Sequence, residues 1–369
     1  APIWKSIGWL SILIPLLGLT YYAVVAAWSL DYLGLAITGS FDGMTGESSQ
    51  ESFALQIGQP FRQLALHGVF ILSVVVVVAR GLHGGIERVS KVAMPALFAI
   101  LLFLVAYNLF QADFGAAVRF LFTPDFSRLG ADAVLMALGQ ALFSLAIGVG
   151  VHITYTAYLP PQFSLSTSAV VVCSGDTLVA VLAGLAIFPI VFQYGLSPGE
   201  GAGLIFVTLP VAFGQMPGGL IIGTMFFLLL FLAAYTTGIA MVEPIVSWLE
   251  EHRGASRPVM TIACGIVAWL GGIISVLSFS ILSDYHPLDS LALMKGKTFF
   301  DIIDFVVANF MLPVNALLIA LFSGWCLDRA TAGAGEEGVQ GPWMVYSRFA
   351  LRFLVPIAMI AIMLDLWFS

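Results

Sequence analysis

The stretch GQALFSLAIGVGVHITYTAYL, residues 139–159, is long enough to cross a bilayer, but Gly148 and Gly150 interrupt it near its middle. Gln140 and Ser144 lie just before the interruption and are poorly suited to hydrocarbon. Backbone that leaves the helix inside a membrane needs new hydrogen-bond partners, so a break persists only where protein or a water-filled cavity surrounds it. Carbonyl groups freed there can bind ions or substrate. The alternative is that the glycines only permit close helix packing.

The composition is that of a membrane protein. Hydrophobic residues make up 60% of the chain and charged residues 9%, against about 25% charged in soluble domains, and the mean hydropathy is +1.01. The net charge of −7 is spread over loops and indicates no nucleic-acid partner. We therefore predict an all-α polytopic membrane protein that forms a single transmembrane domain over residues 1–369.

Apolar runs long enough to span a bilayer can be counted directly, since about 20 helical residues cross the hydrocarbon. Residues 195–215 are too short for a span and predict a short re-entrant or surface helix pair. If the chain starts in the cytoplasm, nine of its 14 Lys and Arg residues lie on the cytoplasmic side, as the positive-inside rule favours. Nine runs are predicted: 7–34, 62–80, 90–111, 132–158, 165–194, 219–249, 258–282, 299–326 and 344–368.

Polar side chains inside these runs are candidates for function. Asp176 lies well within the fifth run, where a carboxylate costs about 2.5–3.5 kcal/mol on insertion scales; the alternative is a protonated or serine-paired structural acid. Ala233, Thr236 and Thr237 share one helix face, and their oxygens suit a hard cation such as Na⁺. The alternative is helix packing, with each threonine bonded to its own turn.

Several strings, taken together and in order, cover almost the whole chain and resemble the neurotransmitter:sodium symporter family in its bacterial amino-acid branch. They are IPLLGLTYY (14–22), GGIERVSKVAMP (84–95), FTPDF (122–126), GQALFSLAIGVGVHITYTAYL (139–159), DTLVAVLAGLAIFP (176–189), FVTLPVAFGQMPGG (206–219), FLAAYTTGIAMVEP (231–244) and IDFV (303–306).

The resemblance implies a LeuT-like inverted-repeat transporter fold, in which two five-helix repeats face each other and two helices break around the substrate. The nine runs resemble helices three to eleven of that fold. Residues 1–111 would be the remainder of the first repeat, 132–328 the second repeat, and 342–369 an additional C-terminal helix. We therefore expect an N-terminally truncated chain that lacks the first two helices.

The resemblance also implies site residues, position by position. Tyr22 matches a tyrosine whose hydroxyl meets the substrate carboxylate, and Phe143 matches an aromatic lid. The implied substrate-binding residues are Gly18, Tyr22, Phe143, Ser144, Ala146, Val149, Thr237 and Met241. The implied sodium ligands are Ala233, through its carbonyl, Thr236, Thr237 and Ser144.

Gln140, Ser144 and Asp176 lie where chloride-dependent relatives bind chloride. Asp176 would supply the negative charge itself, and transport would then not require chloride. The resemblance further implies an extracellular gate acid, Asp304, and a cytoplasmic gate formed by Tyr158 and Glu251.

The function implied is sodium-coupled symport of an amino acid by alternating access, in the bacterial inner membrane. The small residues at the substrate positions favour a large hydrophobic or aromatic substrate. Sodium ions are the expected cosubstrate, and no organic cofactor is expected. An oligomer is possible, but the sequence does not indicate one. The main alternative is a transport-inactive membrane scaffold or sensor of the same fold. An intramembrane enzyme using Asp176 and His152 is not supported, because no spacing supplies a nucleophile or metal cluster.

Overall fold

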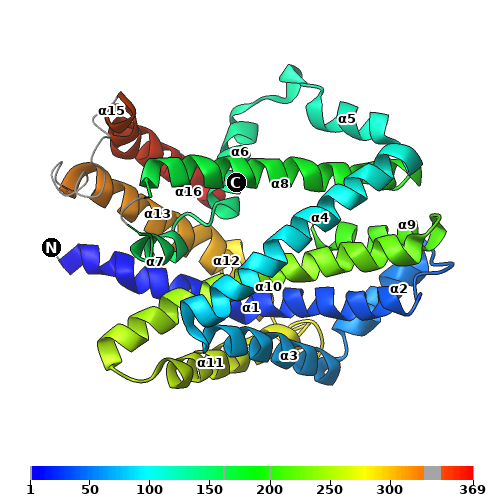
Figure 1. Ribbon diagram of the computed structural model, residues 1–369, viewed down its shortest axis with the longest axis horizontal. Coiled ribbons are helices and arrows are strands. Elements are labelled where there is room, and N and C mark those ends of the chain that lie inside the picture. Colours follow the sequence, from blue (N-terminus) through cyan, green and yellow to red (C-terminus); the bar gives the residue numbers. More distant parts are fainter. Residues whose placement is uncertain (1, 161–162, 199–200, 328–341, 369) are drawn as a thin grey trace.

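A computed structural model describes residues 2–160, 163–198, 201–327 and 342–368. Within these ranges the chain is built of helices joined by turns and loops (Figure 1). Eight helices are long and apolar enough to cross a membrane. They are formed by α1 (Lys5–Ile37), α3 (Pro60–Val78), η2 and α4 (Leu82–Ile86 and Glu87–Gln111), α8 (Leu165–Gln193), α10 (Gly219–Arg253), α11 (Arg257–Leu277), α12 to η7 (Phe299–Phe305, Val306–Met311, Leu312–Leu321 and Phe322–Cys326), and α15 to α16 (Pro342–Phe349, Ala350–Leu354 and Val355–Phe368).

The remaining predicted run, 132–158, is split, as its glycines indicate. Helix α6 (Ala131–Ser144) ends where the break begins, and α7 (Val151–Ala157) starts after it. Neither piece alone is long enough to span a bilayer, whereas the pair covers the predicted run 132–158. The described part of the chain therefore accounts for all nine predicted runs, one of them discontinuous.

Helix α1 runs through the centre of the bundle beside α3, α10 and α11 (Figure 1). These four helices share an apolar core that includes Leu19, Ala23, Phe70, Val246 and Ala268, each of which is buried. Small side chains and glycines let membrane helices approach closely. Because the hydrophobic effect does not drive helices together within lipid, the dispersion contacts made at this close approach stabilise the packing. This packing fixes the side of α1 that faces α10.

A second core lies toward the other end of α1 and contains a cluster of aromatic side chains. Here the short helices η4 (Leu204–Thr208) and α9 (Leu209–Gln215) pack on the bundle. Phe206 stacks on Phe53 with a ring separation of 5.7 Å and meets the edge of Trp28 at 5.8 Å. The predicted short helix pair at 195–215 thus covers the end of the bundle, next to helix α2 (Gly46–Ile57).

A third, smaller core joins α6, α13 (Leu312–Leu321) and α16 through Leu142, Leu312, Ala316 and Met359. The remaining short elements are α5 (Phe114–Phe122), which packs on α8, and three single-turn helices, η1 (Pro2–Trp4), η3 (Phe126–Arg128) and η5 (Ala292–Met294). The division into an incomplete first repeat over residues 1–111 and a second repeat over 132–328 stays a prediction.

Candidate functional site

The break between α6 and α7 is a stretch of left-handed backbone. Ala146, Gly148 and Gly150 have φ values of 50°, 94° and 90°, a region that glycine enters without steric cost. A Cβ at Gly148 would lie 2.6 Å from the carbonyl oxygen of Leu312, and one at Gly150 would lie 2.7 Å from that of Ser11. The two glycines therefore serve both the turn and the close approach of α1 and α13.

Side-chain donors bind two of the carbonyls at the break, those of Leu145 and Gly148. His152 Nε2 lies 2.7 Å from the carbonyl oxygen of Leu145, so this nitrogen carries the proton. The amide nitrogen of Asn315, which is fully buried, donates to the carbonyl of Gly148 at 2.7 Å and lies 3.1 Å from the hydroxyl of Ser11. His152 thus has a hydrogen-bond partner within the broken segment. Asn315 holds the break to α13, and the sequence had not singled it out.

The predicted residues on α1 and α10 come together. A Cβ on Gly18 would lie 2.7 Å from Cε of Met241, so the two positions face each other. The Tyr22 hydroxyl donates to the carbonyl of Ala234 at 3.4 Å and also interacts with the side chain of Thr237. These contacts place a phenol and a threonine hydroxyl at the same point between two helices.

A cavity of about 210 Å³ opens beside this point. Its walls include Tyr22, Ala233 and Thr237 from the predicted site, together with Ile205 and Phe206 from the short helix η4. The cavity thus extends from the predicted substrate and sodium positions toward the aromatic end of the bundle.

Three oxygens converge on this part of α10. The hydroxyls of Thr236 and Thr237 each lie 3.0 Å from the carbonyl oxygen of Ala233. Both hydroxyls are bonded to their own helix turn, as the packing interpretation expects, but Thr237 is exposed and Thr236 is half-buried. Each hydroxyl oxygen keeps lone pairs for a further partner. The cluster therefore fits a hard cation that prefers neutral oxygen ligands.

The break carries a second group of predicted residues. The Ser144 hydroxyl donates to Asp176 Oδ1 at 2.6 Å, which joins the end of α6 to α8. Gln140 lies one turn earlier on α6 and is exposed, as is Phe143. Within the described residues no hydrogen bond links this group to Tyr22 or Thr237. The structure thus shows the predicted site as two halves, one on α1 and α10 and the other on α6 and α8.

The predicted gate residues lie in two separate places, Asp304 beside the middle of α1 and Tyr158 beside α10. Asp304, on α12, interacts with the hydroxyl of Tyr21. The Tyr158 hydroxyl donates to Glu243 Oε1 at 3.0 Å and lies 2.9 Å from the hydroxyl of Ser247. The structure therefore pairs Tyr158 with Glu243 instead of with Glu251, which is exposed.

Glu243 is the centre of this second network. Its side chain is fully buried and forms an ion pair with Arg257, which is also 3.3 Å from Glu250 and donates to the carbonyl of Val78 at 2.9 Å. The network joins α3, α7, α10 and α11 at one end of the bundle. Glu243 is not among the site residues that the sequence singled out; the signal that could have found it was Arg257, the arginine that opens the next helix.

The comparisons with known proteins agree with this architecture. Residues 44–283 match the family described as the Sodium:neurotransmitter symporter family. The chain belongs to this family. The symporter is 38% identical over 366 residues to the uncharacterized sodium-dependent transporter YhdH of Bacillus subtilis, a match that covers 98% of this chain and 80% of that relative. It is 29% identical to an uncharacterized sodium-dependent transporter of Haemophilus influenzae, with 98% and 79% covered.

The fold of the symporter is the LeuT-like fold. The crystal structure of MhsT in complex with L-phenylalanine superposes with a TM-score of 0.87 at 35% identity, covering 98% of this chain and 81% of that one. The predicted family and fold class are thereby confirmed. The symporter is a multi-pass membrane protein of a transporter family, not an enzyme.

Proposed function

We propose that the symporter couples the entry of Na⁺ to the uptake of a large hydrophobic or aromatic amino acid by alternating access. The observation that carries this proposal is that the Thr236 and Thr237 hydroxyls meet the Ala233 carbonyl, and that Ala233 and Thr237 line one cavity together with Tyr22. Sodium-dependent transport is in the names of the Bacillus and Haemophilus relatives, and MhsT was solved with L-phenylalanine. Both support the same assignment.

Each residue has a role in this proposal. The Ala233 carbonyl and the two threonine hydroxyls supply neutral oxygen ligands to Na⁺, and Tyr22 donates its hydroxyl to the substrate carboxylate. Ser144 adds a further hydroxyl for Na⁺ from the broken helix, and Phe143 closes over the substrate. Because Na⁺ and substrate each favour the arrangement in which the two halves of the site meet, binding of one promotes binding of the other.

The driving force is adequate for accumulation. A tenfold Na⁺ gradient is worth about 1.4 kcal/mol, and a membrane potential of ~100 mV adds about 2.3 kcal/mol per charge. One Na⁺ per substrate can therefore sustain roughly several-hundred-fold accumulation. The positive-inside rule supports a cytoplasmic location for the start of the chain and for the Glu243–Arg257 network.

The side-chain pocket predicts the substrate class. Gly18 has no side chain, Met241 opposite it is flexible, and Ala146 and Val149 are modest in size, so the space suits a large apolar group. We expect tryptophan, tyrosine, phenylalanine and leucine to compete strongly with a labelled substrate in uptake assays. Glycine and alanine should compete weakly, and a clear preference for either of them would contradict the assignment while leaving sodium coupling intact.

From the position of Asp176 we predict that transport does not require chloride. Its carboxylate, held by Ser144 at 2.6 Å, supplies the negative charge that an anion would otherwise bring. We expect Asp176→Ser to lower uptake about tenfold in chloride-free buffer, corresponding to about 1.4 kcal/mol of lost charge stabilisation, and chloride to restore it. Asp132→Asn, at the exposed first turn of α6, is the control and should stay chloride-independent. Uptake by the Asp176→Ser variant that ignores chloride would refute this role.

A further inference from the structure

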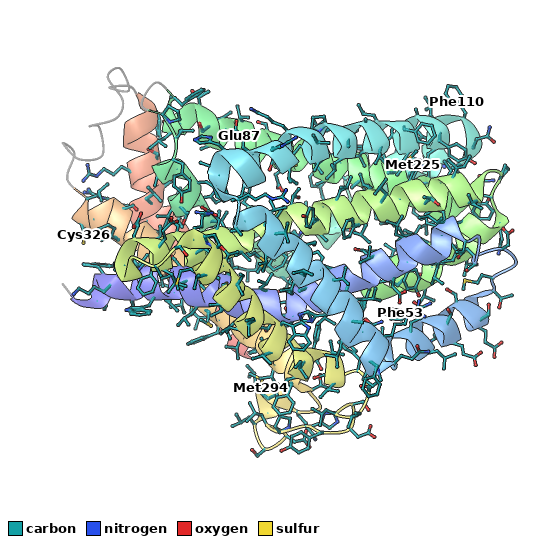
Figure 2. The ribbon with its side chains drawn as sticks, turned by 60° about the horizontal axis from the view of Figure 1, so that its bottom comes forward. Phe53, Glu87, Phe110, Met225, Met294 and Cys326 are labelled. Atoms are coloured by element: carbon teal, nitrogen blue, oxygen red, sulfur yellow. The ribbon has the colours of Figure 1, made fainter. Side chains whose placement is uncertain are left out.

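A second cavity, of about 380 Å³, lies between the end of α3, the π-helical turn η2, the first turns of α4, and α10. It is separate from the cavity beside Tyr22, since the two share no lining residue. Figure 2 labels Glu87 and Phe110 at the two ends of α4, and the cavity lies at the Glu87 end. This is the end of the bundle that also carries Arg257, which approaches Gly81 there.

Two arginines line the mouth of this cavity without a carboxylate to neutralise them. Arg80 and Arg88 are both exposed, and neither forms an ion pair among the described residues. Glu87, the carboxylate of the same connector, is already paired with Lys91 at 2.6 Å and with His83 at 2.8 Å. The mouth therefore carries two free positive charges.

The rest of the cavity is apolar. Val77 comes from α3, Val92 and Ala96 from α4, and Leu232 from α10. Val92 is 70% exposed, so this wall opens to the outside of the bundle. Tyr235 contributes an aromatic ring whose hydroxyl is bonded to the carbonyl of Ser73 at 3.1 Å. Paired cations above an apolar groove at a helix end match the two parts of a lipid, a charged headgroup and an acyl chain.

We propose that this cavity binds an anionic phospholipid, with its phosphate between Arg80 and Arg88 and an acyl chain along Val92, Ala96 and Leu232. Arginine suits this role because its guanidinium group can meet phosphate oxygens with two parallel hydrogen bonds. The bound lipid bridges α3, α4 and α10, and so ties the outer helix α4 to the helices of the central core.

The test is native mass spectrometry of the purified symporter, as the complete gene product, titrated with dioleoylphosphatidylglycerol or dioleoylphosphatidylcholine. The wild type is expected to bind the first phosphatidylglycerol molecule more tightly than phosphatidylcholine. Arg80→Gln with Arg88→Gln should weaken phosphatidylglycerol binding by about 30-fold. Arg119→Gln with Lys295→Gln removes two exposed charges elsewhere and should leave it unchanged.

A second variant tests the acyl groove with both arginines intact. A Cβ on Gly84, which lines the cavity, meets nothing within 4 Å, so Gly84→Leu partly fills the space without a clash. It should weaken phosphatidylglycerol binding, whereas Gly34→Leu, in open space on α1, should not. The proposal is overturned if the arginine variant binds phosphatidylglycerol like the wild type. It is also overturned if glycerol 3-phosphate displaces the lipid at equal concentration, which would indicate a soluble phosphate site.

Discussion

Replacing Thr236 and Thr237 together by valine is expected to lower the apparent Na⁺ affinity of uptake on the order of a hundredfold. Each substitution removes one oxygen from the cluster around the Ala233 carbonyl and keeps the shape of the side chain. Losing one interaction with a charged partner costs about 1.5–3 kcal/mol, which is roughly tenfold or more in affinity per hydroxyl. The measurement is the Na⁺ concentration for half-maximal uptake in proteoliposomes.

The matched control uses a threonine with the same local bonding outside the cluster. Thr177 on α8 is exposed and bonds to the carbonyl of its own turn, Cys173, at 3.0 Å. Thr177→Val should leave the Na⁺ dependence unchanged. If the double variant on α10 keeps wild-type Na⁺ affinity, the threonines act only in helix packing and the sodium assignment is wrong.

Arg257→Gln is expected to destabilise the symporter by about 3 kcal/mol, because it leaves the carboxylate of Glu243 buried without its partner. The Glu243 side chain is 0% exposed and that of Arg257 15% exposed, so solvent screens the pair little. Glutamine also cannot replace all the donors that reach Glu250 and the carbonyl of Val78. The measurement is the thermal unfolding midpoint in detergent, which should fall by several degrees.

Two further variants test whether the loss of stability comes from leaving the buried Glu243 charge unpaired or from a general effect of substitution. Lys91→Gln breaks the exposed Glu87–Lys91 pair, whose side chains are 40% and 73% exposed, and should leave the unfolding midpoint almost unchanged because solvent screens the pair. Adding Glu243→Gln to Arg257→Gln removes the uncompensated charge and should recover part of the loss. Equal destabilisation by Lys91→Gln and Arg257→Gln would show that the buried Glu243–Arg257 pair contributes no more to stability than the exposed pair does.

The helix break was predictable because its cause is local. Gly148 and Gly150 interrupt an otherwise continuous apolar run, and no distant residue is needed to see that the helix weakens there. The left-handed conformation of Ala146 was not predictable, since an alanine adopts it only when surrounding packing compensates for the strain. The partners of the break, Ser11 and Asn315, are 304 positions apart in the chain, and only the folded structure brings them together.

In the α1–α10 half of the site, too, some features could be predicted from the sequence and others could not. Helical spacing put Thr236 and Thr237 on one face, and the family resemblance added Gly18, Tyr22 and Met241. Their meeting depends on how α1 crosses α10, which neither periodicity nor composition determines. At the other end, Glu243 and Glu251 are eight residues apart on one helix, which separates them by about 12 Å along the helix axis and about 80° around it. Tyr158 therefore reaches one carboxylate and not the other.

Uptake of labelled tryptophan into proteoliposomes containing the complete gene product tests the central claim of sodium coupling most directly. With an inward Na⁺ gradient, the account predicts accumulation above the external concentration, collapse when a sodium ionophore dissipates the gradient, and no accumulation with K⁺ in place of Na⁺. If tryptophan, tyrosine, phenylalanine and leucine are neither bound nor accumulated at high Na⁺, the protein is not a symporter of these substrates. A membrane scaffold built on the same fold would then be the better assignment.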